Sequence, residues 1–283
     1  MTGSKHRFDC SERLFGKEGQ DRLRQASVAV IGVGGLGTHV VQQVALLGVG
    51  AASLIDHEEL SRSNQNRYVG AWYDDRIPGF LKVQLGARLI RLIDPSIIVE
   101  RVPERFPSQA SLKAVRESDF VFGCVDNDGV RFVLNEACLA YEKPLFDLAT
   151  DVLEGGRYGG RVDVVTGKGG CLYCRKLLDD DEVRRFMSPP EALENEAAVY
   201  GIDPRFLGES GPSVASLNGV VASLGVTEFM VTATYMRPPY QHLEYRGDLG
   251  VVRTRKDSPT DCYYCDVVRG QGNAAKIERY FAP

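Results

Sequence analysis

The chain has 283 residues, of which 43% are apolar, and a formal net charge of −4 at pH 7, values typical of a globular protein that buries a large core. It carries no basic run, which argues against nucleic acid as a partner. The amino terminus has no apolar stretch long enough for a signal peptide, and we expect no later segment to span a bilayer, so the sequence predicts a cytoplasmic protein without a membrane partner.

The first half of the chain alternates strand and helix patterns. Short β-branched runs begin at residues 27, 52, 97, 119 and 144, and helical patterns cover residues 36–47, 80–93 and 128–141. This alternation is typical of parallel strands joined by crossover helices. The predicted fold class is therefore α/β, with a doubly wound, Rossmann-like and mostly parallel sheet.

The second half has a different pattern from residue 151 onward. It begins with a strand-like run at 158–165 and continues with a polar stretch at 179–213 whose acidic start, DDDE, is typical of a solvated helix face. Residues 188–212 are interpreted as a long exposed crossover or mobile loop. An apolar helix is predicted to begin near residue 214.

A glycine-rich turn separates the first predicted strand from the first predicted helix of the alternating half. Gly32, Gly34 and Gly37 form the pattern G-x-G-x-x-G, in which missing side chains let the backbone approach phosphates at a helix amino terminus. Asp56 ends the next strand, where a carboxylate binds ribose hydroxyls. The motif indicates a nucleotide without saying which one.

Polar residues beyond Asp56 favour a triphosphate over a dinucleotide. Asn64, Arg67 and Lys82 follow in order, and an arginine with a lysine is suited to neutralising a triphosphate. Asp126 and Asn127 end a later strand, at the sheet edge that borders the ligand crevice. The Asp126 carboxylate there is a suitable ligand for magnesium.

The seven cysteines favour a metal site over a disulfide framework in a chain without an export signal. Four of them form two C-x-x-C pairs separated by 87 residues, namely Cys171 with Cys174 and Cys262 with Cys265. This spacing predicts one structural zinc that ties the C-terminal region to the preceding chain; two redox pairs are the alternative. Cys10, Cys124 and Cys138 have no such spacing, and the last two are predicted to be buried.

These motifs, taken in order, resemble the ThiF/MoeB superfamily over nearly the whole chain. The matching segments are GVGGLG at 32–37, LID ending at 56, RSNQNR at 62–67, FLKVQ around 82, CVDN at 124–127, and both cysteine pairs. The resemblance implies a homodimer that binds ATP and Mg²⁺ and adenylates the C-terminal glycine of a ubiquitin-like or sulfur-carrier protein, releasing pyrophosphate. It implies a nucleotide-binding part at 1–150, and a carrier-binding, zinc-containing part of the same domain at 151–283.

The resemblance also implies a role for each site residue. The turn with Gly32, Gly34, Gly35 and Gly37 would face the nucleotide, Asp56 would hold the ribose, and Asn64, Arg67 and Lys82 would grip phosphates. Asp126, with Asn127 beside it at the cofactor, would organise magnesium. Arg13 is the best match to the family's amino-terminal arginine that reaches the partner subunit's phosphates, and Arg7 is the alternative. Arg67, Lys82, Asp126 and Arg13 would thus carry catalysis.

Two other classes of protein share parts of this pattern. A nicotinamide-dependent Rossmann oxidoreductase would explain the glycine turn and Asp56, but neither the phosphate-binding residues nor the cysteine pairs. A non-catalytic nucleotide-sensing module would use the same pocket.

The acyl acceptor after adenylation is a separate question. No cysteine lies between Cys174 and Cys262, so we predict no internal thioester on a crossover cysteine. The adenylate would pass directly to an acceptor such as a downstream conjugating enzyme's cysteine, or to a hydroxyl, with Ser210 or Ser213 as candidates. A role for these serines in loop and helix-cap contacts is the favoured interpretation.

Overall fold

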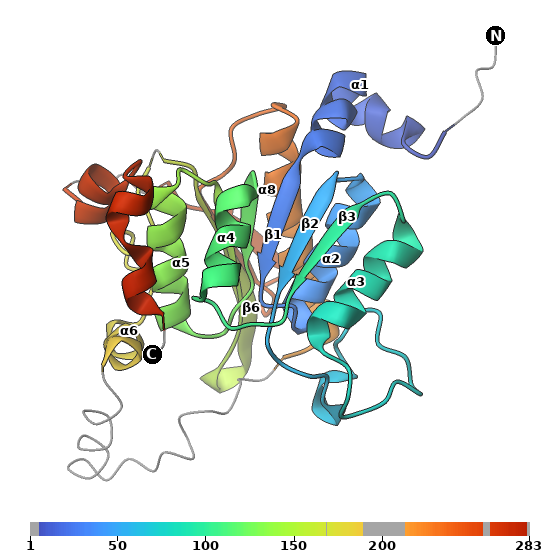
Figure 1. Ribbon diagram of the computed structural model, residues 1–283, viewed down its shortest axis with the longest axis horizontal. Coiled ribbons are helices and arrows are strands. Elements are labelled where there is room, and N and C mark those ends of the chain that lie inside the picture. Colours follow the sequence, from blue (N-terminus) through green and yellow to red (C-terminus); the bar gives the residue numbers. More distant parts are fainter. Residues whose placement is uncertain (1–5, 168, 189–212, 257–260, 282–283) are drawn as a thin grey trace.

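A single mixed sheet organises the part of the chain that the computed structural model describes, which is residues 6–167, 169–188, 213–256 and 261–281 (Figure 1). Its strands lie in the order β3-β2-β1-β4-β5-β6-β7-β8. The five parallel strands are β1 (Ser27–Ile31), β2 (Ala51–Ile55), β3 (Ile98–Val102), β4 (Phe120–Gly123) and β5 (Leu145–Leu153). The antiparallel strands are β6 (Arg157–Val165), β7 (His242–Arg246) and β8 (Val251–Thr254). This confirms the predicted fold class.

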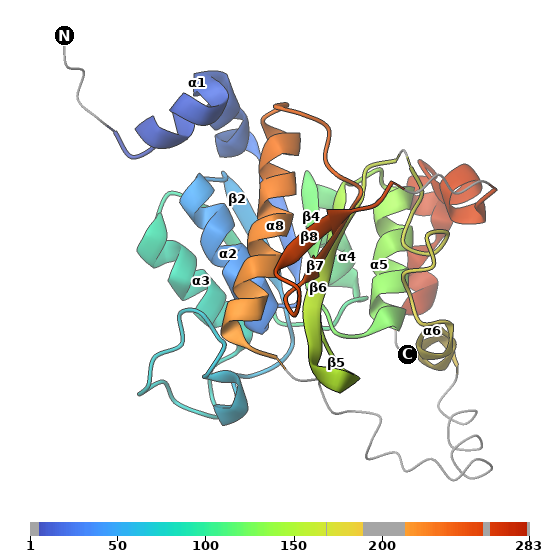
Figure 2. The ribbon, with the colours of Figure 1, turned by 180° about the vertical axis from the view of Figure 1, so that it is seen from behind.

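Helices cover both faces of the sheet, as the two opposite views show (Figures 1 and 2). One face carries α2 (Gly35–Leu47), α3 (Lys82–Ile93) and α8 (Ala215–Ala233), and the other carries α4 (Gln109–Glu117) and α5 (Asp128–Ala140). The helix α1 (Asp9–Gln25) leads into β1, and α6 (Asp180–Met187) packs beside α5. The two larger hydrophobic cores of the described residues lie one on each side of the sheet.

Successive side chains of a strand point to opposite faces of the sheet, so one strand contributes to both cores. In β1, Val28 and Val30 belong to the core under α2 and α8, while Ala29 and Ile31 belong to the core under α4 and α5. A parallel strand covered on both faces is apolar at every position for this reason. In β6 the alternation is different, because Val162 and Val164 belong to the core under α2 and α8, whereas the opposite face carries the charged residues Arg161 and Asp163 before Val165.

The elements expected from the alternating half are all present, and the apolar helix near residue 214 is present as α8. The sequence analysis did not predict α1, α4, β7 or β8. The loop expected at 188–212 lies outside the described residues, apart from Ser188 at the end of α6.

One described helix, α8, is long and apolar enough to cross a bilayer by length and composition alone, which the sequence analysis did not expect. The structure shows α8 as a core helix: Val221, Val226 and Phe229 are buried against the sheet. Glu228 is also buried and forms an ion pair with Arg237 at 2.7 Å. A core helix of a soluble protein meets the same two criteria.

Candidate functional site

The glycine turn between β1 and α2 has a geometry that only glycine allows. Gly32 has a φ of +88° and donates its backbone N–H to the Ile55 carbonyl at 2.9 Å. A Cβ atom on Gly37 would lie 2.0 Å from the Gly32 carbonyl oxygen, so a side chain there would displace the turn. The amino terminus of α2 therefore starts immediately behind a bare backbone turn, an arrangement that binds phosphates.

Asp56 directly follows β2 and is held against this turn. One carboxylate oxygen accepts the Val33 N–H at 2.8 Å, and the other accepts the Glu58 N–H at 2.9 Å. Burial raises the pKa of this carboxyl above its ordinary value of 3.8, although the Lys82 charge opposes the shift. The structure thus places Asp56 beside the glycine turn, as the sequence predicted.

Lys82 begins α3, and its side chain is buried and paired with Glu58. The Lys82 N–H also donates to the Glu58 carbonyl at 2.9 Å, and the Tyr68 hydroxyl donates to the Lys82 carbonyl at 2.8 Å. Burial opposes ionisation of Glu58, but the hydrogen bond and charge of Lys82 outweigh it and lower the Glu58 pKa. Sequence reasoning missed Glu58, whose only signal is its position two residues after Asp56.

Arg67 lies against the start of α2. A Cβ atom on Gly35 would be 3.0 Å from Arg67 Cγ, and the guanidinium donates to the Ser63 carbonyl at 2.6 Å. Asn64 has a local role, because its side-chain oxygen accepts the Ser61 N–H at 3.3 Å and shapes this turn. Asp56, Lys82 and Arg67 are therefore gathered around the glycine turn from three separate segments.

The loop after β4 completes this edge of the sheet. A Cβ atom on Gly32 would lie 2.7 Å from the Cys124 carbonyl oxygen, so the loop adjoins the glycine turn. Asp126 is exposed, and its side chain forms no hydrogen bond or ion pair with any other described residue. Arg131, which sequence reasoning missed, braces the loop by donating to the Val125 carbonyl at 2.5 Å.

The Asn127 side chain is occupied by structural contacts. Its oxygen caps α5 by accepting the Val130 N–H at 2.9 Å, and its nitrogen donates to Glu182 at 2.9 Å. Both polar ends are thus engaged within the chain. The nucleotide-binding role expected for Asn127 stays a prediction, and it would require one of these contacts to break.

The two amino-terminal arginines lie away from this site. Because α1 enters the start of β1 and the glycine turn follows the end of β1, the two features occupy opposite edges of the sheet (Figure 1). Arg13 is exposed on α1. Arg7 is bound to its own chain, through the Ile93 carbonyl at 2.9 Å and Asp94 at 3.2 Å.

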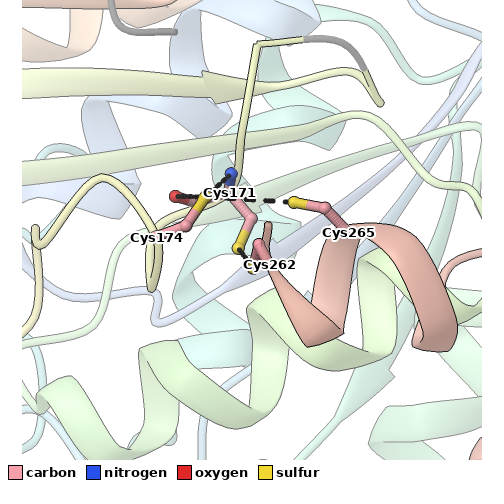
Figure 3. Close-up of side chains that lie close together, drawn as sticks. All are labelled: Cys171, Cys174, Cys262 and Cys265. Atoms are coloured by element: carbon pink, nitrogen blue, oxygen red, sulfur yellow. Dashed lines mark hydrogen bonds between the residues drawn. The ribbon is translucent and has the colours of Figure 1, made fainter. Parts of the chain in front are cut away.

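The four cysteines of the two C-x-x-C pairs converge into one cluster (Figure 3). Their sulfur atoms all lie within 4.8 Å of one another, and Cys171–Cys262 and Cys174–Cys265 are each separated by 3.9 Å. A tetrahedral zinc with Zn–S bonds of 2.3 Å requires sulfur separations of about 3.8 Å. Burial raises the pKa of Cys174 to about 11, whereas hydrogen bonds from neighbouring groups outweigh burial and lower the pKa of Cys262. A bound cation would hold all four sulfurs as thiolates at neutral pH. The cluster fits a zinc ion.

The remaining cysteines are separate from this cluster. Cys138 is buried, Cys124 is partly buried against the core, and Cys10 is exposed. Burial raises the pKa of the Cys124 and Cys138 thiols far above their ordinary value of 9.0. Neither is a reactive thiol in this structure.

A chain of buried charges crosses β5, β6 and β7 on the face that carries α5. Asp147 lies 3.1 Å from Arg161 and 3.7 Å from Arg131, and Arg161 also pairs with Asp163. Asp163 in turn lies 2.7 Å from Nδ1 of His242. Both aspartate side chains are fully buried. The sequence analysis did not identify this network. Two of its members, Arg161 and His242, line a cavity of about 730 Å³ over β6 and β7.

The sequence pattern of the ThiF family matches residues 9–246, which include the glycine turn, Asp56, Lys82 and Asp126. The chain belongs to the ThiF family. This confirms the resemblance drawn from the motifs. The matched region also includes the first cysteine pair and the strands β6 and β7.

Curated relatives of this ThiF-family chain are named as adenylyltransferases. It is 29% identical over 260 residues to the bovine adenylyltransferase and sulfurtransferase MOCS3, which covers 89% of this chain and 50% of that protein. It is 31% identical over 195 residues to the sulfur carrier protein adenylyltransferase of Thermus thermophilus, covering 68% of this chain and 69% of that protein. The chain thus spans about half the length of the MOCS3 relative.

Solved structures share the fold at lower identity. E. coli MccB with MccA-N7isoASN has a TM-score of 0.72 at 19% identity, over 93% of this chain and 75% of that one. E. coli MccB with ATP has a TM-score of 0.70 at 20% identity, with the same coverage. PaaA has a TM-score of 0.67 at 20% identity, over 90% of this chain and 85% of that one.

Proposed function

We propose that this protein uses ATP to adenylate the C-terminal glycine of a ubiquitin-like or sulfur-carrier protein and releases pyrophosphate. The observation that carries the proposal is the convergence of Asp56, Lys82 and Arg67 on the glycine turn at the amino terminus of α2. The names of the curated relatives support the same reaction.

The proposed chemistry is mainly positioning and charge neutralisation. The carrier's carboxylate and the α-phosphate that it attacks are both negatively charged and repel each other. The protein must therefore supply positive charge and hold the two groups in the orientation for attack. The α2 amino terminus, Lys82 and Arg67 provide that charge, while Asp56 holds the ribose. Lys82 is already desolvated and held by Glu58, so little reorganisation is needed when phosphates arrive.

Asp126 is the residue proposed to hold magnesium. Its carboxylate is exposed next to the glycine turn and engages no other described side chain, and carboxylates are ligands that Mg²⁺ prefers. When bound, the ion would neutralise charge on the phosphates. Zinc at the four cysteines has a structural role in this proposal, as a tether between the C-terminal region and the chain after β6.

We assign residues 1–150 to nucleotide binding and residues 151–283 to carrier binding within one domain. A homodimer is proposed because the family resemblance implies an amino-terminal arginine that reaches the partner subunit's phosphates, and Arg13, the best match to it, is exposed on α1 at the edge opposite the glycine turn. We also propose a cytoplasmic location.

The acyl group is proposed to leave without an internal thioester. Cys124 and Cys138 are unreactive by burial, and the cysteine cluster is assigned to zinc. The Ser213 hydroxyl is engaged with Asn218, at 3.1 and 3.3 Å, which favours a structural role for it; Ser210 lies outside the described residues. A partner enzyme's cysteine is therefore the proposed acceptor.

The test is ATP–pyrophosphate exchange with and without ubiquitin-like proteins that end in glycine. Exchange should appear only with a carrier, and Asp126→Ala should abolish it. Asp21→Ala, which removes a half-exposed carboxylate on α1, should leave it unchanged. Exchange that survives Asp126→Ala contradicts the assignment of Asp126. Nucleotide binding without exchange for any carrier would indicate a sensing module, and a reducible bound nicotinamide would indicate an oxidoreductase.

A further inference from the structure

A basic groove lies over β6, β7 and β8, on the face of the sheet that carries α5. Its cavity of about 730 Å³ is lined by residues of all three strands and of the segment that follows Cys174. The groove includes Asp151 at the carboxyl end of β5. Because β5 is parallel to β4, this end lies at the same edge of the sheet as the glycine turn.

The floor of the groove is held by the buried charges of β6 and β7. Arg161 is fixed between Asp147 and Asp163, and Asp163 also fixes His242. Arg175 lies beside them and donates to the Val164 and Gln241 carbonyls, at 3.0 and 2.9 Å. These side chains are locked by their partners, so the floor is rigid.

Cations dominate the solvent-facing rim of the groove. Arg157, Lys176 and Arg253 line the cavity and are exposed, and none of the three forms an ion pair with another described residue. Two carboxylates, Asp151 and Glu244, also line it. The chain as a whole carries a net charge of −4, so this concentration of positive charge is opposite in sign to the rest of the molecule.

We propose that this groove binds the C-terminal segment of an acidic substrate polypeptide, and that Arg157, Lys176 and Arg253 select its aspartate and glutamate side chains. The inference rests on the proposed function, since the glycine that follows this segment must reach the nucleotide turn. An extended segment of six residues spans about 20 Å, which is shorter than the nine residues of β6. Complementary charge supplies specificity and faster association in such a cleft.

The probe is a fluorescein-labelled peptide with four glutamates before a terminal Gly-Gly, compared with the same peptide carrying glutamines. Fluorescence anisotropy with the full chain should show tighter binding of the glutamate peptide, and added salt should weaken that binding. Arg157→Glu, Lys176→Glu and Arg253→Glu should each weaken it by about threefold to tenfold. They should leave the weaker glutamine peptide unaffected.

Lys113→Glu is the matched control, because Lys113 is an exposed lysine on α4 with a side chain 62% accessible, outside the groove. It should not change binding of either peptide. Thermal unfolding of each variant identifies any that fails to fold. If one charge-reversed variant fails to fold, the two remaining charge-reversed variants test the proposal.

Each outcome separates the inference from the proposed function. Selective binding of the glutamate peptide without carrier-dependent exchange supports the groove and overturns the proposed function. Exchange with a carrier, combined with equal binding of the two peptides and no effect of the reversals, overturns the groove. If a labelled single-stranded RNA with the same number of negative charges binds more tightly than the glutamate peptide, the result also overturns the inference, in favour of a nucleic-acid groove.

Discussion

The replacement Arg161→Met tests whether the buried charge network stabilises this half of the sheet. The side chain of Arg161 is 14% accessible, and it faces two aspartates with no accessible side-chain surface. Methionine keeps the length of the side chain and removes its charge. Among the residues that the structure describes, the change leaves Asp147 paired with Arg131 alone, at 3.7 Å, and leaves Asp163 paired with His242 alone.

We expect the free energy of unfolding to fall by about 3–5 kcal/mol at neutral pH, since removing one partner of a buried pair leaves an uncompensated buried charge. For a domain of this size that corresponds to a decrease in Tm of about 10 °C. The double replacement Arg161→Met with Asp163→Leu should recover about 1–3 kcal/mol of the loss, because it removes one of the unpaired carboxylates.

The loss should also depend on pH. Burial raises the pKa of Asp147 above 3.8, against the charges of Arg131 and Arg161. A protonated Asp147 therefore favours the folded state, and this contribution disappears as the pH rises through the raised pKa. Losing Arg161 raises that pKa further, so the difference between the two proteins should shrink as the pH falls from 7 into the acidic range above 3.8.

Urea denaturation followed by circular dichroism at several pH values measures these quantities. Stability equal to that of the unmodified protein would show that the network contributes nothing. A double variant that is less stable than the two single effects add up to would contradict the argument from unpaired charge. A difference in free energy of unfolding between Arg161→Met and the unmodified protein that grows as the pH falls would contradict it as well.

Three further experiments test the site. Gly37→Ala should weaken ATP binding more than about tenfold, because it displaces the phosphate-binding turn. The control Gly219→Ala, whose Cβ would lie 3.4 Å from His39, should not weaken it. Calorimetric titration with ATP measures both affinities, and equal affinities of the two variants would contradict the role of the turn. Cys262→Ser should lose the one zinc expected per chain and lower stability by several kcal/mol, whereas Cys10→Ser should do neither, and elemental analysis that finds no zinc in the freshly purified protein would refute the metal site. Incubation with ATP and carrier should give no reductant-sensitive adduct on a denaturing gel, so an adduct mapped to Cys10 would overturn direct transfer.

Local patterns determined much of the fold and of the nucleotide site. The alternation of strands and helices is visible because covered parallel strands are apolar throughout. Gly32 and Gly37 are visible because the backbone at these two positions tolerates no side chain. Asp56 could be placed because it ends a strand next to the one before the turn. These signals depend on neighbours in the sequence.

The antiparallel half was less visible for a physical reason. β7 and β8 carry charged residues such as Glu244, Arg246 and Arg253, so they lack the apolar signal of a covered strand. The sequence therefore predicted β6 without showing what would pair with it.

The tertiary structure alone decided which side chains meet. C-x-x-C spacing defined each cysteine pair, but only the fold brings the two pairs within 4.8 Å across 87 intervening residues. The contacts of Lys82 with Glu58, of Arg161 with Asp147, and of Asn127 with Glu182 likewise join separate segments. Desolvation and ion pairing depend on distance in space, and a one-dimensional pattern of residue types does not specify that distance.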